Sequence, residues 1–208
     1  MYKFKNLLNP GGMIAILWIF LSLLPASGKT SETLEQQLLD GRSVIHLLEP
    51  QDREGKGYKL IYVVDAPLEI FWKFKTDFDN EFLLSNKLIH SHRLLSQKGN
   101  VVVTENRYAN KPGAVFRWQT TVLPNRHLLK FILLNPQECG QKYHSGYIRL
   151  ERLDQKTKVI QVAYFDFFGA SFWVKYPYYG GMKHFLEYTA NWEQQAILNL
   201  KERYQYQP

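Results

Sequence analysis

Hydrophobic and polar side chains alternate through the middle of the chain. In residues 115–123, for example, Phe116 and Trp118 fall on one side, and Arg117 falls on the other. A repeat of two is typical of a β-strand with one buried face. Such segments, separated by turns rich in glycine, proline and asparagine, predict strands at 89–96, 101–108, 115–123, 127–134, 143–153 and 158–168. Their regular spacing indicates an antiparallel meander.

A mixture of helix and strand patterns precedes the meander. In chain order, it predicts a helix at 30–39, strands at 43–48 and 59–65, a helix from Pro67 to about 77–80, and a short helix at 81–86. Proline suits the first turn of a helix, because its missing N–H would be unpaired there anyway. Glu69 follows in that turn, where a carboxylate offsets the positive end of the helix. Phe71 and Phe74 then recur at helical spacing and predict one apolar face.

The chain closes on a long helical pattern that follows Gly180 and Gly181. Between residues 182 and 204, apolar or small side chains recur every three or four positions at Met182, Phe185, Leu186, Thr189, Trp192, Ala196, Ile197 and Leu200. A helix over this range is roughly 35 Å long. That length is sufficient to cross a whole sheet and to cover its apolar face, which an antiparallel sheet with one wet face requires.

The stretch 63–78 carries a family resemblance. Its motifs, in chain order, are Asp65-Ala66-Pro67, Phe71-Trp72 and Thr76-Asp77-Phe78. This stretch resembles the opening of START-like domains, a superfamily that includes Bet v 1, polyketide cyclases and lipid-transfer domains. The layout from about Leu39 to Tyr204 is similar to theirs, although Lys75 replaces a usual apolar residue and Leu84 a frequent proline. The resemblance implies an α+β helix-grip fold. In that fold a curved antiparallel sheet wraps around a long C-terminal helix, with two short helices after the first full strand.

The helix-grip fold implies an apolar cavity between the sheet and the long helix. We expect aromatic and apolar side chains of the inward sheet face and of the helix to contact a ligand there. The predicted ligand-binding residues are Phe116, Trp118, Phe131, Ile148, Tyr164, Phe165, Trp173, Phe185, Thr189 and Trp192. This choice depends on the strand register, because a slip of one residue moves every side chain to the other face.

Aromatic residues are densest in the segment 165–179, between the last predicted strand and the long helix. Two interpretations are open. The aromatic side chains either fill the end of the core, or form an apolar lip that admits a lipid and makes transient contact with a membrane.

The first 28 residues have the pattern of a secretory signal peptide. Lys3 and Lys5 precede an apolar run at 13–24, and Ala26 and Gly28 offer the small residues of a cleavage site. The run is short for a membrane span, which needs about 20 residues, although an uncleaved N-terminal anchor is the alternative. We therefore expect a signal peptide at 1–28, a single domain at 29–208, and a periplasmic or secreted protein.

Composition and charge exclude other classes. Hydrophobic residues make up 45% of the chain and aromatic residues 15%, which excludes a disordered protein. The formal net charge is +7, and Lys and Arg are scattered along the chain, so a solvated surface is favoured over nucleic-acid binding. Cys139 is the only cysteine, so the domain holds no internal disulfide.

Candidate catalytic chemistry is sparse. No nucleophile elbow, His-Glu-x-x-His motif or phosphate-binding glycine loop occurs, and His90 and His92 lack a nearby third metal ligand. We therefore expect no cofactor and no metal. Five polar residues, His144, Tyr164, Asp166, Arg117 and His184, are candidates to project into the cavity and orient a ligand, although each is individually more typical of a wet face.

The sequence thus predicts an exported, non-enzymatic carrier of a hydrophobic small molecule or lipid. One alternative is an enzyme of the polyketide cyclase or dehydrase type, in which His144, Tyr164 and Asp166 would supply the acids and bases. Another alternative is an interaction module of the cell envelope that has a filled core and no cavity.

Overall fold

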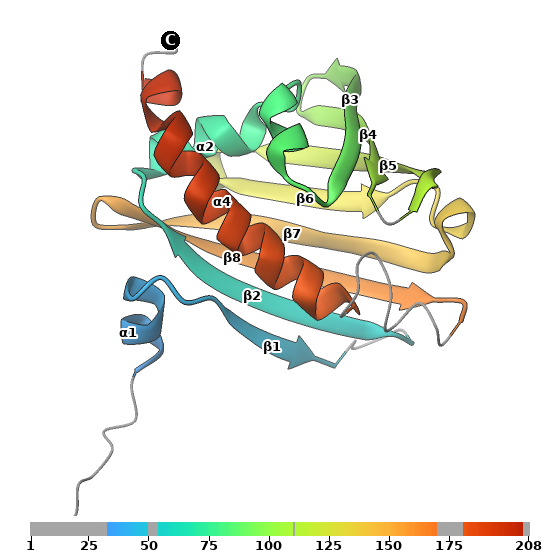
Figure 1. The fold of residues 1–208 in the computed structure, drawn as a ribbon, viewed down its shortest axis with the longest axis horizontal. Helices are drawn as coiled ribbons and strands as arrows, with labels where there is room; N and C mark the ends of the chain where they lie inside the picture. Colours follow the sequence, from blue (N-terminus) through green and yellow to red (C-terminus); the bar gives the residue numbers. More distant parts are fainter. Residues whose placement is uncertain (1–32, 50–53, 110, 170–180, 206–208) are drawn as a thin grey trace, which may run out of the picture. The chain divides into compact units, whose positions relative to one another are not determined.

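The computed structural model describes residues 33–49, 54–109, 111–169 and 181–205 (Figure 1). The expected signal peptide and the predicted ligand contact Trp173 lie outside these ranges. The elements are α1 (Leu34–Leu39), β1 (Val44–Leu48), β2 (Lys56–Val64), α2 (Leu68–Thr76), η1 (Glu81–Ser85), β3 (Ile89–Lys98), β4 (Val101–Tyr108), β5 (Lys111–Leu123), η2 (Pro124–Arg126), β6 (Leu128–Leu133), η3 (Gln137–Cys139), β7 (Gln141–Leu153), β8 (Lys156–Phe167) and α4 (Gly181–Gln205).

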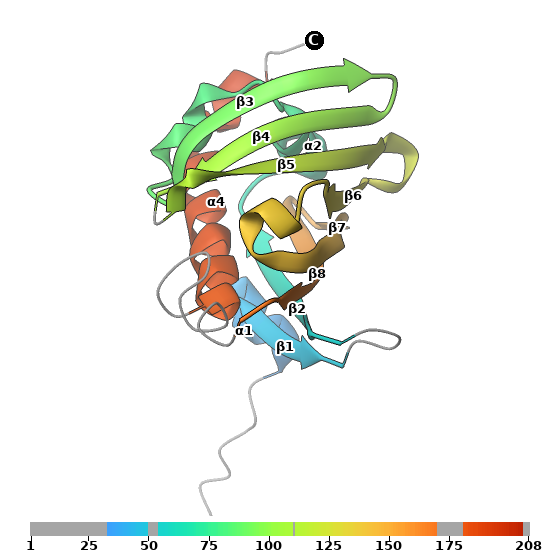
Figure 2. The ribbon, with the colours of Figure 1, turned by 90° about the vertical axis from the view of Figure 1, so that its right-hand side faces the viewer.

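All eight described strands form one antiparallel sheet in the order β1-β2-β8-β7-β6-β5-β4-β3. The meander from β3 to β8 is continuous, and β2 joins it beside the last strand. Figure 2 shows the sheet curving around α4, which lies in its concave side. The predicted α+β helix-grip fold is therefore confirmed, with α2 and η1 as the two short helices after the first full strand.

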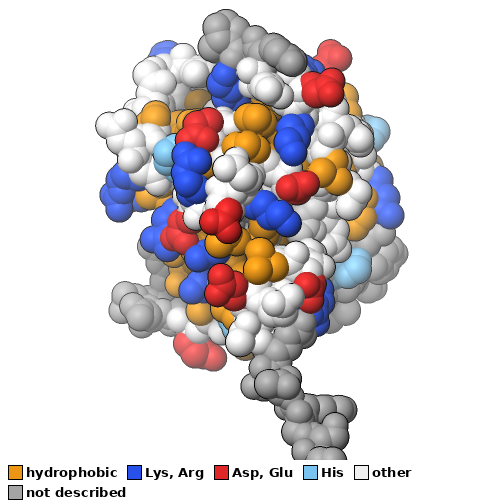
Figure 3. Space-filling view, turned by 90° about the vertical axis from the view of Figure 1, so that its left-hand side faces the viewer, with side chains coloured by type: hydrophobic (Ala, Val, Ile, Leu, Met, Phe, Trp, Pro, Cys, Tyr) orange, Lys and Arg blue, Asp and Glu red, His pale blue; other side chains and the backbone are white. Residues whose placement is uncertain are grey.

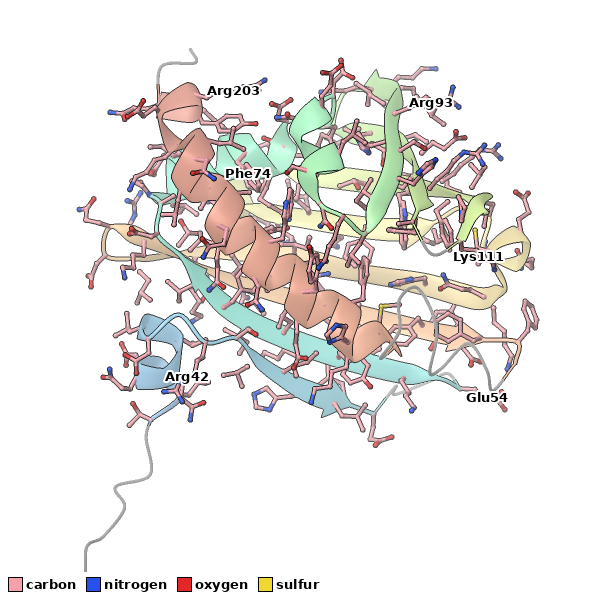
Figure 4. All side chains as sticks on the ribbon, in the orientation of Figure 1. Arg42, Glu54, Phe74, Arg93, Lys111 and Arg203 are labelled. Carbon is pink, nitrogen blue, oxygen red and sulfur yellow. The ribbon has the colours of Figure 1, made fainter. Side chains whose placement is uncertain are left out.

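Helix α2 joins the first full strand to the long helix. Pro67, the predicted helix start, occupies the N-cap, so α2 begins one position later, at Leu68, and Glu69 lies in the first turn. The buried face of α2 includes Phe74, which points toward α4 (Figure 4). Its ring centroid lies 6.3 Å from that of Trp192 and 5.9 Å from that of Tyr204, both on α4. Aromatic packing thus connects the stretch 63–78, which carries the family resemblance, to the terminal helix α4.

Local details differ from the predicted boundaries. Strand β5 begins at Lys111 rather than at residue 115, because Lys111 pairs with Tyr108 directly across the hairpin. Strand β6 begins at Leu128 rather than at residue 127, because His127 adopts a left-handed conformation with φ of 43° and ends η2. The short helix predicted at 81–86 is a 3₁₀-helix rather than an α-helix.

Strand β2 is buried on both faces. Leu60, Tyr62 and Val64 belong to the main core between the sheet and α4. Ile61 and Val63 belong to a smaller cluster on the outer face, which Leu38 of α1 helps to cover. Double burial explains why residues 60–64 of this strand are apolar without alternation.

The outer surface carries mixed charges. Figure 3 shows Lys and Arg interspersed with Asp and Glu over the face that it displays. On β7 and β8, Glu151 pairs with both Arg149 and Lys158, each at 2.7 Å. Charges of both signs within ion-pairing distance lower the local net field, as on an ordinary solvated surface.

Candidate functional site: a cavity between the sheet and the long helix

A cavity of about 220 Å³, here called the first lobe, lies between the concave sheet face and the start of α4. It is lined by Thr104, Asn106, Tyr108, Trp118, Thr120, Phe131, His144, Ile148, Gln161, Met182, Phe185 and Leu186. Most of these are apolar or aromatic, and a few polar groups converge among them. That combination is typical of a binding site for a small organic ligand.

Four predicted ligand-binding residues line this lobe. Trp118, Phe131 and Ile148 come from β5, β6 and β7, and Phe185 comes from α4. The predicted alternation therefore places the correct faces inward, since Trp118 faces the cavity while Arg117 bonds Glu105 on the opposite side.

Gly146 allows the Phe131 ring to occupy this place. A Cβ atom at Gly146 would lie 2.7 Å from the Phe131 ring and 2.0 Å from the carbonyl oxygen of Val162. Real Cβ atoms essentially never approach so closely. Glycine on β7 thus lets the aromatic side chain of β6 lie across the neighbouring strand.

A second lobe of about 170 Å³ shares Thr120, Phe131 and Ile148 with the first. It extends along the sheet toward α2. The remaining lining residues, contributed by α2, the η1 region, β6 and α4, are Phe74, Lys75, Asp77, Phe78, Leu83, Leu129, Trp192 and Glu193. Predicted Trp192 therefore borders this lobe, where three charged residues also occur.

The charged side chains of the second lobe form hydrogen bonds with one another and with tyrosine hydroxyls. Lys75 Nζ donates to Glu193 Oε1 at 2.6 Å, and the Tyr62 hydroxyl donates to Glu193 Oε2 at 2.5 Å. Burial, reinforced by the Glu193 carboxylate, raises the pKa of Tyr62 well above its usual value, so Tyr62 remains a donor. Asp77 accepts from the Tyr204 hydroxyl at 2.8 Å.

His144 is the main polar group of the first lobe. Its side chain is surrounded by aromatic rings, with centroids 4.8 Å from Trp118, 5.4 Å from Phe165 and 6.1 Å from Phe131. Burial lowers the pKa of His144 to about 3, so the imidazole is neutral at physiological pH. Its Nδ1 has no hydrogen-bond partner among the described residues.

Several other predicted contacts lie elsewhere. Phe116 is fully buried against Tyr108, and Phe165 is fully buried against Tyr58, so both fill the core beside the cavity rather than line it. Thr189 bonds back to the Phe185 carbonyl of its own helix. Tyr164 is three residues from Gln161, which faces the cavity, so it lies on the outer face of β8.

The other polar candidates also point away from the cavity. Asp166 pairs with Lys142 at 2.8 Å on the outer side of the sheet. Arg117 pairs with Glu105 at 3.3 Å, and His184 is exposed on α4. Of the five polar candidates, His144 is the one that lines the first lobe.

Sequence reasoning missed the Lys75–Glu193 pair. Glu193 follows Leu186 by seven residues and precedes Ile197 by four, so it occupies the buried stripe of α4. The sequence did contain a signal for this pair: Lys75 and Glu193 are charged residues that each occupy an apolar position of a helix. It suggests a buried pair, because an isolated buried charge is strongly unfavourable.

Two further findings concern metals and membranes. Among the described residues, no three His, Cys, Asp or Glu side chains gather closely enough to hold a metal ion. No helix in the described ranges combines the length and apolar character that crossing a membrane requires.

Comparisons with known proteins agree on the fold. No protein-family model and no curated protein sequence matches the chain. Norcoclaurine synthase from Thalictrum flavum aligns with a TM-score of 0.53 and 12% identity over 76% of this chain and 98% of that one. A STAR-related lipid transfer protein from Xanthomonas axonopodis aligns with a TM-score of 0.50 and 8% identity, over 78% and 93%. A protein from Thermus thermophilus aligns with a TM-score of 0.52 and 12% identity, over 71% and 96%.

Proposed function

The chain has the START-like, Bet v 1-like helix-grip fold, and we propose that it binds a hydrophobic small molecule or lipid and carries it unchanged. The observation that supports this proposal is the first lobe, an apolar cavity of about 220 Å³ between the sheet and the long helix. Transfer of apolar ligand surface from water into it would contribute roughly 25 cal/mol per Å². Proteins of the same fold include a lipid transfer protein and a synthase whose structure holds dopamine and hydroxybenzaldehyde.

Within the first lobe, the arrangement of titratable groups favours a carrier over a polyketide cyclase or dehydrase. General acid–base chemistry needs groups that face the ligand and titrate near the working pH. Tyr164 lies on the outer face and Asp166 pairs with Lys142, so neither reaches the first lobe. His144 does face it, but its pKa of about 3 keeps it neutral rather than poised for proton transfer. The open lobes likewise speak against an interaction module with a filled core.

We further propose export. The support is the leader pattern at 1–28, with its two lysines, apolar run and small residues before the expected cleavage point. N-terminal sequencing of the protein recovered from the periplasm or medium would detect a start near residue 29. Recovery of the uncleaved chain from the cytoplasm would refute this part of the proposal.

Transient contact with a membrane is part of the carrier proposal. Phe168, at the end of β8, is 60% exposed, and an exposed aromatic side chain suits the interface between lipid and water. Flotation with anionic liposomes tests it: wild-type protein should float with the vesicles, and Phe168→Ser should float less. Equal flotation of the two proteins would refute a role for this residue.

Native mass spectrometry and solvent extraction of the purified protein test ligand binding directly. Ile148 borders both lobes, so Ile148→Trp should fill the space and abolish binding of added lipid. Ile132→Trp is the matched control, because Ile132 lies on β6 and is 46% exposed. The proposal fails if no lipid co-purifies and added fatty acids, sterols and naphthalene all fail to bind.

A further inference from the structure

His144 is a polar side chain that is surrounded by aromatic rings. Its side chain is 7% exposed and lines the first lobe, and the Trp118 ring stands nearly perpendicular to it at 82°. Phe131 and Phe165 approach from two other strands. An apolar side chain of similar size would fill this place without burying a polar nitrogen. Packing alone therefore does not account for an imidazole here.

The unpartnered Nδ1 of His144 indicates what the ring can do. Buried polar atoms are nearly always hydrogen-bonded in folded proteins, and one that is not calls for an explanation, of which a partner supplied by another molecule is one. No described residue bonds this atom. A ligand group that reaches it would replace a missing bond, whereas a purely apolar ligand would leave the bond unmade.

The surroundings of His144 disfavour a charged ligand. Among the described residues, the polar groups that share the first lobe are the side chains of Thr104, Asn106, Thr120, Gln161 and Tyr108 and the indole N–H of Trp118, and none carries a charge at neutral pH. Burial raises the pKa of Tyr108 to about 12 and lowers that of His144 to about 3, so both titratable groups stay neutral. An ionised carboxylate or phosphate would lose its hydration here without gaining a counter-charge.

The charged residues of the second lobe do not change this picture. Lys75 is bonded to Glu193, which also accepts from Tyr62, and Asp77 is bonded to Tyr204. Each charge is therefore occupied within the protein. A ligand that entered from the first lobe would have to break one of these contacts to use it.

We propose that the ligand is an amphiphile whose polar group is an uncharged hydroxyl, and that His144 forms a hydrogen bond with this hydroxyl while the apolar body lies against Trp118 and Phe131. The inference rests on the proposed ligand-binding function and specifies its ligand class. A hydroxyl both donates and accepts, so it suits either tautomer of the imidazole.

Three bicyclic probes that differ in one substituent test the inference. They are 2-naphthol, naphthalene and 2-naphthoate, each measured with the full chain by equilibrium dialysis at pH 7. We expect 2-naphthol to bind about tenfold more tightly than naphthalene, the typical effect of one added hydrogen bond to a buried group. We expect 2-naphthoate to bind more weakly than both, because its carboxylate is charged.

Variants connect the preference to His144. His144→Phe removes the ring nitrogens, so the ratio of the naphthalene and 2-naphthol Kd values should fall to about one, while naphthalene affinity stays within about twofold. His144→Gln keeps a hydrogen-bonding side chain and should retain part of the preference. His46→Phe is the matched control, because His46 is exposed on β1, and it should behave as wild type.

The outcomes separate the inference from the proposed function. If 2-naphthoate or naphthalene binds wild-type protein as tightly as 2-naphthol, the hydroxyl preference is wrong although the protein binds hydrophobic ligands. If His144→Phe keeps the full preference, another residue recognises the hydroxyl and the inference is overturned. If no probe binds the wild type, the proposed ligand-binding function fails with it. Should His144→Phe not fold, the order of the three probes on wild-type protein still tests the hydroxyl preference, and a His144→Gln variant with unchanged preference would overturn the role of His144.

Discussion

Buried His144 should make the protein lose stability in mild acid. Its folded-state pKa is about 3, whereas an unperturbed histidine has a pKa of roughly 6.5 in an unfolded chain. Below pH 6.5 the unfolded state therefore binds a proton that the folded state refuses, which lowers the free energy of unfolding. The destabilisation is absent above pH 6.5 and grows as the pH falls toward 3, where it levels off.

The size of the effect follows from the pKa difference. One pKa unit corresponds to 1.36 kcal/mol, so the whole window from 6.5 to 3 is worth about 5 kcal/mol. Between pH 7 and pH 5 the loss should be about 2 kcal/mol. Desolvation is the cause of this shift, and no carboxylate or basic side chain of the described residues shares the first lobe with His144. A charged neighbour should therefore not mask the effect.

Urea unfolding followed by far-ultraviolet circular dichroism, at pH 7 and pH 5, provides the measurement. The fall in unfolding free energy should be about 2 kcal/mol smaller in His144→Phe than in wild type. Other titrating groups contribute to both proteins and cancel in the difference. His46→Phe should keep the wild-type pH dependence. If His144→Phe and wild type lose the same stability within about 0.5 kcal/mol, His144 is not buried neutral and the reasoning is refuted.

Three further predictions follow from buried groups. Glu193→Leu should lower the free energy of unfolding by about 3–5 kcal/mol in urea titrations, because Lys75 loses its partner. The double variant Lys75→Met/Glu193→Leu should recover part of this loss, since the Tyr62 hydroxyl still lacks its acceptor. A double variant no more stable than the single one would contradict the pairing. Gly146→Ala should cost at least about 2 kcal/mol in the same assay through its clash with the neighbouring strand, whereas Gly113→Ala, with open space around it, should be nearly neutral; similar losses would refute the clash. Cys139 is fully buried and burial raises its pKa to about 11, so a thiol reagent at pH 8 should react far more slowly with folded than with urea-unfolded protein. Equal rates would show that the thiol is accessible.

Strand faces in the meander were predictable because a sheet has a strict repeat of two. Once Trp118 was placed inward, the register of β5, β6 and β7 carried Phe131 and Ile148 to the same side. The same rule places Tyr164, a predicted ligand contact, on the opposite side of the sheet. Parity with Gln161 assigns it to the outer face.

Alternation does not distinguish a side chain that lines a cavity from one that fills the core beside it. Phe116 and Phe165 face inward as predicted, yet both are fully buried among other side chains. Whether an inward residue meets empty space depends on the size and rotamer of its neighbours on other strands, such as the Phe131 ring that lies over Gly146. No local pattern encodes that packing.

The sequence by itself determined the order of the elements and most inward faces of the meander, because each follows from short-range periodicity and from turn chemistry. The tertiary structure alone decided the chemistry of the cavity. Lys75 and Glu193 are 118 residues apart along the chain, and they meet only because α2 and α4 pack together. Likewise, the neutral state of His144 depends on rings from three other strands that remove water from it. Burial and pairing act through space, and so they appear only when the sheet has closed around the helix.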